Sequence, residues 1–165
     1  MSEVLAYLLL GSNIGDRAAH LKQAQVQLAA TTGEIVAFSA FYETAAWGLE
    51  NQPAFLNQAL AIRTALDAPA LLSACLAAEQ QAGRERQQRW AARTLDVDIL
   101  LYGNAIIQTP TLTVPHPALP DRRFALTPLA EIAPQLVHPQ LGQTVAELLA
   151  SCPDPLAVIK WQMSR

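Results

Sequence analysis

Short apolar runs alternate along the chain with segments of helical periodicity, and this order predicts a fold of mixed α and β structure. The apolar run at 3–10 ends before a glycine, which is typical of a buried strand. Three more strands are predicted from β-branched, aromatic and apolar residues at 35–43, 56–66 and 95–102. Two shorter strands are predicted at 105–108 and 156–162.

Two helices are predicted between these strands, each after an aspartate that can act as an N-cap. One helix follows Asp16 and ends near Gly33, and the other follows Asp67 and ends near Gly83. The four prolines of 109–121 exclude a helix or sheet interior there, and short helices are predicted at 124–132 and 143–150. The order β-α-β-β-α-β predicts an α+β, ferredoxin-like βαββαβ sandwich with extra C-terminal helices and strands, forming a single domain over residues 1–165.

Composition narrows the possible functions. With 52% hydrophobic and 15% charged residues, the 165-residue chain does not have the composition of a disordered protein. A net charge of −3 argues against general attraction to nucleic acid or to a membrane surface. No apolar run reaches the roughly 18 residues of a membrane span, the N-terminus is acidic, and two cysteines make no disulfide framework. We therefore expect a cytoplasmic monomer whose partners are small molecules.

A pair of aspartates in the strand at 95–102 is the most informative chemical feature. Asp96 and Asp98 share one strand face, with their Cα atoms about 6.6 Å apart at the usual strand rise. Two carboxylates this close need cations or arginines to offset their repulsion, and carboxylates with phosphate oxygens are typical ligands of magnesium. The alternative is an exposed strand face whose carboxylates pair with nearby arginines.

An arginine-rich segment leads directly into this strand. Four of the nine arginines fall within residues 84–93, around Trp90. Arginine guanidinium groups bind phosphate oxygens, and a tryptophan can stack on a planar ring. A solvated loop is the usual meaning of such a run, but its position beside two aspartates indicates a nucleoside triphosphate bound with magnesium.

Several other residues are candidates for ligand binding. His116 lies between two prolines and could donate to a phosphate, although a lone histidine is more often structural. Phe55 and Phe124 could sandwich a flat heterocycle, with Asn57 beside the first ring, or could be core residues. Residues 11–16 lack the sequence of a phosphate loop, and a turn followed by a helix cap accounts for them.

These motifs, in this order, resemble the 6-hydroxymethyl-7,8-dihydropterin pyrophosphokinase family of folate synthesis. The resemblance extends from Gly11 to Pro134 and is most specific over 84–103 and 114–124. It implies an ATP- and magnesium-dependent transfer of diphosphate from ATP to the pterin hydroxymethyl group, with release of AMP.

The resemblance also implies a role for individual residues. Two magnesium ions are expected on Asp96 and Asp98, which with Arg84 and Arg93 form the catalytic set. The residues expected to bind ATP are Glu79, Arg84, Arg86, Arg93, Ile99, Thr113, His116 and Arg122. Those expected to bind the pterin are Thr44, Ala45, Trp47, Phe55, Asn57, Trp90 and Phe124.

The chain departs from the family's pattern in three segments. Ala45 and Ala46 stand where one or two prolines are usual, and Trp47 beside them adds bulk near the expected pterin edge. Ala91–Ala92 replaces a Gly-Pro pair, and Thr111 replaces an arginine of some members. The first two changes bear on pterin affinity and on closure of the arginine segment. The departures leave two alternatives, a paralogue acting on another pterin-like alcohol and an inactive ATP-binding relative. A third alternative is an RNA-binding module that uses the arginines and exposed aromatic residues.

Overall fold

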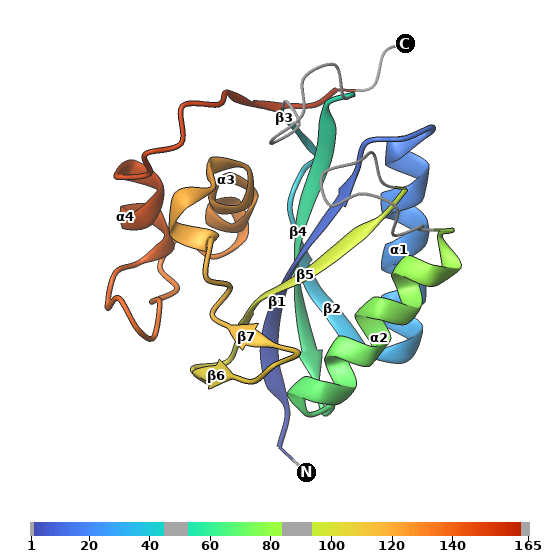
Figure 1. The fold of residues 1–165 in the computed structure, drawn as a ribbon, viewed down its shortest axis with the longest axis horizontal. Helices are drawn as coiled ribbons and strands as arrows, with labels where there is room; N and C mark the ends of the chain where they lie inside the picture. Colours follow the sequence, from blue (N-terminus) through green and yellow to red (C-terminus); the bar gives the residue numbers. More distant parts are fainter. Residues whose placement is uncertain (1, 45–52, 84–93, 163–165) are drawn as a thin grey trace.

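The computed structural model describes residues 2–44, 53–83 and 94–162, and its centre is an antiparallel sheet between two layers of helices (Figure 1). The strands run in the order β5-β1-β4-β3-β8, and β2 also pairs with β4. Their bounds are β1 Val4–Ser12, β2 Gly33–Phe38, β3 Tyr42–Thr44, β4 Phe55–Thr64, β5 Asp96–Tyr102 and β8 Val158–Lys160. A separate two-stranded sheet joins β6 (Ile107–Gln108) to β7 (Thr113–Val114).

Helices cover both faces of the main sheet (Figure 1). One face carries α1 (Arg17–Thr31) and α2 (Ala68–Gln81), whose N-caps Asp16 and Asp67 accept hydrogen bonds from backbone N–H groups three residues on. The other face carries α3 (Arg123–Ile132) and α4 (Val145–Ala150), which follow the short 3-10 helix η1 (Leu119–Asp121). No helix of the described residues is long and apolar enough to cross a membrane.

Alternation along the central strands divides the core in two. Leu8 and Leu10 of β1 belong to the hydrophobic cluster under α1 and α2. Tyr7 and Leu9 belong to the cluster under α3 and α4. Because successive strand side chains point to opposite faces, the same alternation divides β4 between the two helical layers. In β5 it holds up to Leu100, and then a register shift against β1 places Leu100 and Leu101 in the same cluster.

The predicted strand at 35–43 is two strands in the structure. Phe38 pairs with Leu60 and Tyr42 with Asn57, so residues 39–41 face only residues 58 and 59. The extra residue interrupts the ladder at Ser39, whose hydroxyl accepts from the Ala59 N–H. One edge of β4 is therefore shared by β2 and β3.

The remaining sequence predictions differ mainly at element ends. The first strand continues through Gly11 and Ser12 instead of ending before them. The proline-rich segment predicted to lack regular structure contributes the two residues of β7 and the helix η1. The helices α1, α2, α3 and α4 confirm the four predicted ones within a few residues, and α4 begins with a capping box between Thr144 and Glu147.

Candidate active site

Gly11, near the C-terminal end of β1, is the centre of a strip that crosses β4, β1 and β5. In the strand registers it pairs with Asn57 of β4 on one side and with Asp96 of β5 on the other. A Cβ at Gly11 would lie 2.6 Å from Asn57 Nδ2 and 3.6 Å from a ring carbon of Phe55. A side chain at Gly11 would therefore displace the Asn57 amide, and the glycine lies between that amide and the carboxylate of Asp96.

The β3–β4 side of this strip combines an aromatic ring with two buried oxygens. Phe55 and Asn57 are two residues apart on β4, and Thr44 is the Cα partner of Phe55, so the three side chains share the face that α3 covers. Asn57 Nδ2 donates to Leu10 O at 3.1 Å. Asn57 Oδ1 and Thr44 Oγ1 are buried and have no hydrogen-bond partner among the described residues. A flat ligand with polar edges could supply such partners.

Helix α3 brings a second aromatic ring to the same face of the sheet. The Arg122 guanidinium lies 5.5 Å from the centre of the Phe124 ring. The first turn of α3 is held from outside the helix, since Arg123 N donates to Asp154 Oδ2 at 3.1 Å. Tyr42 OH also donates to Glu131, and this hydrogen bond joins α3 to β3. Burial, and after it the contact with Glu131, raises the pKa of Tyr42 to about 12.

The two aspartates of β5 lie on the other side of Gly11. Val97 and Ile99 point into the core under α1 and α2, so Asp96 and Asp98 share the opposite face, and both are half-buried. Glu79 of α2 reaches the backbone between them, where its Oε2 accepts from Val97 N at 2.9 Å. Glu79 therefore fixes the start of β5.

Carboxylates give this end of β5 a negative potential. The thiol of Cys75 in α2 is fully buried, and burial is the first cause that raises its pKa to about 12. The negative charges of Glu79 and Asp98 are the smaller causes of the same rise in pKa. The same potential favours a cation at the aspartates.

His116 is held next to β5 as a neutral imidazole. Its backbone N donates to Leu100 O at 2.9 Å, and its Nδ1 accepts from Ala118 N at 3.1 Å. Burial, and after it the positive charge of Arg122, lowers the pKa of His116 to about 4. The neutral ring with Nδ1 as acceptor carries its hydrogen on Nε2, which can donate to an anion.

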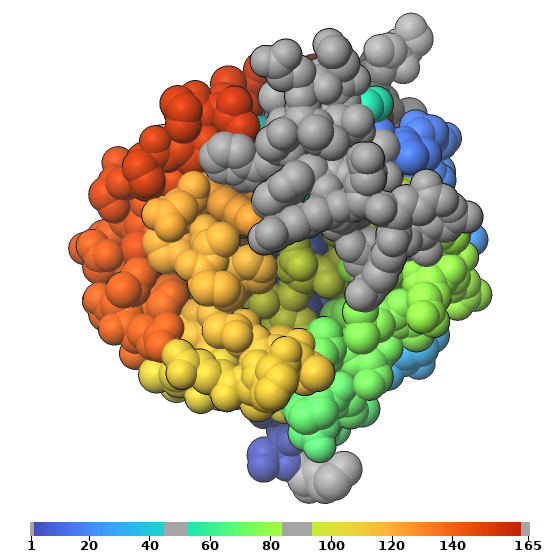
Figure 2. Space-filling model, in the orientation of Figure 1, coloured from blue at the N-terminus to red at the C-terminus, as the bar shows by residue number. Residues whose placement is uncertain are grey.

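The space-filling view shows where a ligand could reach β5. Atoms of β5 lie at the bottom of a recess, between α2 in green and the yellow and orange segment that contains β7 and the start of α3 (Figure 2). His116 and Arg122 belong to the segment that contains β7 and the start of α3. The recess therefore lies between the elements that carry several of the predicted ATP-binding residues.

The structure brings together most of the predicted site residues that it describes. Ile99 is 5% exposed with its side chain in the core, and Thr113 is exposed on β7. Predictions on six further residues lie outside the described residues: Ala45, Trp47, Arg84, Arg86, Trp90 and Arg93.

Sequence reasoning missed Gly11 and Arg17 as candidates. Gly11 belongs to residues 11–16, which were attributed to a turn and a helix cap, and Asp16 is indeed the cap of α1. Arg17 follows this segment as the first residue of the predicted helix. A glycine inside an apolar strand signals close approach by a neighbouring group, and that signal could have singled out Gly11.

Solved structures with a similar fold include HPPK-DHPS chains. A crystal structure titled as HPPK-DHPS in complex with substrates matches 92% of this chain with a TM-score of 0.70 at 15% identity, and the match covers 43% of that chain. Wild-type HPPK-DHPS of Plasmodium falciparum matches 90% of this chain with a TM-score of 0.70 at 15% identity. The chain spans less than half of these proteins, and at such identity the likeness defines the fold, a mixed α and β structure with an antiparallel sheet.

The family is defined by sequence. The model of the 7,8-dihydro-6-hydroxymethylpterin-pyrophosphokinase (HPPK) family matches residues 7–134, and the chain belongs to this family. Curated relatives named 2-amino-4-hydroxy-6-hydroxymethyldihydropteridine pyrophosphokinase include that of Methylorubrum extorquens, 49% identical, which covers 93% of this chain and 96% of the relative. The enzyme of that name from Bacillus subtilis is 46% identical and covers 80% of each chain.

Proposed function

We propose that this chain transfers the diphosphate group of ATP to the hydroxymethyl group of 6-hydroxymethyl-7,8-dihydropterin in folate biosynthesis, with release of AMP. The observation that carries the proposal is the strip centred on Gly11. Two carboxylates lie on one side of the glycine, and an aromatic ring with two unpartnered buried oxygens lies on the other. Such a strip matches a reaction between a phosphate–metal complex and a flat heterocyclic alcohol.

The β3–β4 side of the strip is the proposed pterin site. A pterin is a flat, polar-edged ring, so it needs stacking faces and hydrogen-bond partners in its plane. Phe55 and Phe124 would provide the faces, while Asn57 Oδ1 and Thr44 Oγ1 would pair with the ring edge. Ala45, Trp47 and Trp90, which lie outside the described residues, complete the proposed set.

The β5 side is the proposed ATP site. Within the described residues no three His, Cys, Asp or Glu side chains gather as a metal centre. Two carboxylates still fit magnesium, because this ion often takes only one or two protein carboxylates and completes its shell with water and substrate phosphates. Asp96 and Asp98 would hold two ions, whose charge offsets that of the transferred group. The other proposed ATP contacts are Glu79, Ile99, Thr113, His116, Arg122 and, outside the described residues, Arg84, Arg86 and Arg93.

The reaction needs positioning more than a strong base. The pterin hydroxyl oxygen bonds to the β-phosphorus of ATP, the bond from that phosphorus to the α,β-bridging oxygen breaks, and the hydroxyl proton is released. Charge spreads over the phosphate oxygens on the way, so fixed donors and cations stabilise the transition state. The neutral His116 and the charged Arg122 would supply such groups from the segment that contains β7 and the start of α3.

The proposal also covers the topology of the fold, the cellular location and the oligomeric state. The sheet order β5-β1-β4 with β2 and β3 beyond β4, all antiparallel, supports a ferredoxin-like βαββαβ core in a single domain over residues 1–165. Both cysteines are free, which suits a reducing cytoplasm. We predict a monomer, and gel filtration with light scattering measures this oligomeric state.

A phosphorus NMR time course with ATP, magnesium and the pterin tests the reaction. We expect AMP and a pterin diphosphate ester from the unmodified chain and from Asp67→Asn, whose new asparagine can still cap α2. Asp96→Asn and Asp98→Asn should remain folded and lose magnesium-dependent turnover. Formation of ADP would instead indicate an ordinary kinase. ATP binding without turnover of this pterin would favour a paralogue with another alcohol substrate or an inactive relative.

A further inference from the structure

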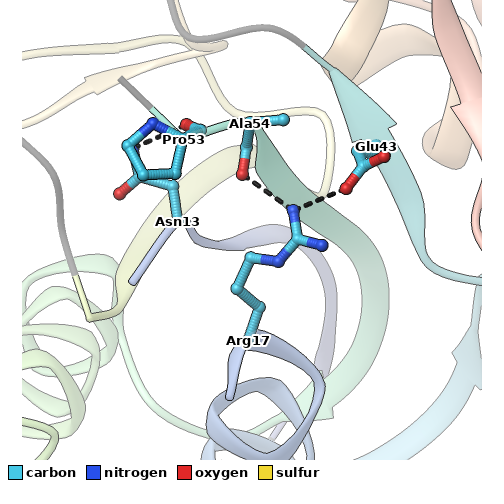
Figure 3. Close-up of polar contacts among 5 residues, drawn as sticks. All are labelled: Asn13, Arg17, Glu43, Pro53 and Ala54. Carbon is cyan, nitrogen blue, oxygen red and sulfur yellow. Dashed lines mark hydrogen bonds and ion pairs between the residues drawn. The ribbon is translucent and has the colours of Figure 1, made fainter. Parts of the chain in front are cut away.

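Arg17 ties together the ends of β3 and β4 from the face of the sheet opposite the proposed pterin site (Figure 3). Its Nη1 lies 2.7 Å from Glu43 Oε2 and donates to Ala54 O at 2.8 Å. Glu43 directly precedes Thr44, and Ala54 directly precedes Phe55. One guanidinium group therefore holds the residues next to the Thr44–Phe55 pair.

The alternation of strand side chains separates this contact from the ligand. Thr44 points toward the α3 face, so Glu43 points to the opposite face, where α1 begins with Arg17. Asn13, from the same β1–α1 turn, adds a hydrogen bond from Nδ2 to Pro53 O at 3.1 Å. Arg17 would thus act through β3 and β4 and not by touching the pterin.

Arg17 carries its positive charge at an unfavourable position in α1, and its contacts with Glu43 and Ala54 compensate for this. It is the first residue of α1, and a positive charge in the first helical turn opposes the helix dipole. Its side chain is 22% exposed, so the two contacts are partly shielded from water. Charge-assisted hydrogen bonds of this kind are stronger than neutral ones.

The strands at this point need such support. β3 has only three residues, and its partners on β4 are the first three residues of that strand. On its other side β3 pairs with β8, which is also only three residues long. Because neither ladder of β3 has more than three residue pairs, a small shift would move the Phe55 ring and the buried oxygens of Thr44 and Asn57. A displacement of about 1 Å at a binding group is enough to reduce activity greatly.

We propose that Arg17 is a positioning residue for the pterin, holding β3 and β4 in the register that presents Thr44, Phe55 and Asn57. The proposal rests on the assignment of the pterin to these three residues. It predicts that loss of Arg17 weakens binding of the pterin much more than binding of ATP.

The chain offers a matched control in a second arginine–glutamate pair. Arg63 Nη1 and Glu34 Oε1 lie 2.9 Å apart between β4 and β2, at the far end of the same strand, and both side chains are more exposed than those of the Arg17 pair. Arg63→Gln therefore removes a cation and an ion pair from β4 without affecting the ends of β3 and β4 near the site.

The experiment measures dissociation constants for the pterin, in the presence of a non-hydrolysable ATP analogue and magnesium, and for the analogue alone. Arg17→Gln should weaken pterin binding about tenfold, raise KM for the pterin more than it lowers kcat, and change analogue binding less than twofold. Glu43→Gln, which leaves the Ala54 contact intact, should have a smaller effect in the same direction. Arg63→Gln should change neither constant.

A Phe55→Ala variant separates failure of this inference from failure of the site. Weaker pterin binding in Phe55→Ala together with an unchanged constant in Arg17→Gln would overturn the positioning role alone. Equal losses of pterin and ATP analogue in Arg17→Gln would also overturn it, because that result indicates a general structural defect. An unchanged pterin constant in Phe55→Ala would overturn the site assignment, and the inference with it.

Discussion

Replacing His116 by glutamine should remove a large part of the acid sensitivity of folding. The folded protein holds this imidazole neutral with a pKa of about 4, because burial and Arg122 both disfavour the imidazolium. Protonation would also place a hydrogen on Nδ1, which accepts from Ala118 N. In the unfolded chain the ring takes up a proton near its ordinary pKa of 6.5.

The sign and size follow from proton linkage. Below pH 6.5 the unfolded chain binds a proton that the folded chain does not, so the stabilising contribution is complete above pH 6.5 and is lost as the pH falls toward 4. With these two pKa values the loss is about 2 kcal/mol at pH 5 and about 3 kcal/mol at pH 4. A loss of this size is a considerable fraction of the roughly 5–15 kcal/mol that stabilises a typical domain.

Urea unfolding of the original chain and of His116→Gln between pH 7.5 and 5 measures this contribution. The original chain should lose about 2 kcal/mol more than the variant over this range. Groups shared by both chains cancel in the difference, including His138, whose pKa is also lowered by burial. NMR titration of the His116 ring should give a midpoint near 4, shifted upward in Arg122→Gln. Parallel stability curves, or a midpoint near 6.5, would refute the reasoning.

Three further changes test the strip and its supports. Gly11→Ala places a Cβ against Asn57 Nδ2, so calorimetry should find a loss of about 1–3 kcal/mol in stability, partly relieved by adding Asn57→Ala, and pterin binding should be weaker in both variants. Asp98→Asn should lose magnesium-dependent turnover while its melting temperature stays within a few degrees of the original, and equal turnover with and without magnesium would contradict this. Asp154→Ala removes the acceptor of Arg123 N and should cost about 1 kcal/mol, measured by urea unfolding; an unchanged midpoint would count against a stabilising role of this hydrogen bond.

The sequence predicted the elements of the fold because their signals are local. Capping aspartates, hydrophobic periodicity and apolar runs each act over a few residues, and α1, α2, β4 and β5 lie where these signals placed them. The break at Ser39 escaped prediction because it depends on a long-range fit. The extra residue of 39–41 is defined only against residues 58 and 59 of β4.

The part of the candidate site that could be predicted is the pair of carboxylates two residues apart on one strand. Alternation alone placed Asp96 and Asp98 on one face, as the structure has them. The importance of Gly11 could not be derived in this way, since it depends on the registers of β1 with both β4 and β5. Arg17 was equally hidden, because its two acceptors lie far along the chain at Glu43 and Ala54.

The two faces of the sheet explain how a binding strip is compatible with a stable core. On the α1–α2 face the central strands present buried leucines up to Leu10 and Leu56, next to the strip itself. On the other face the same strands change from apolar residues to Gly11 and Asn57. The polar groups of the site therefore lie on strands whose opposite face is packed. A substitution on the α3 face near Gly11 should change binding more than stability, while one at Leu10 should do the reverse.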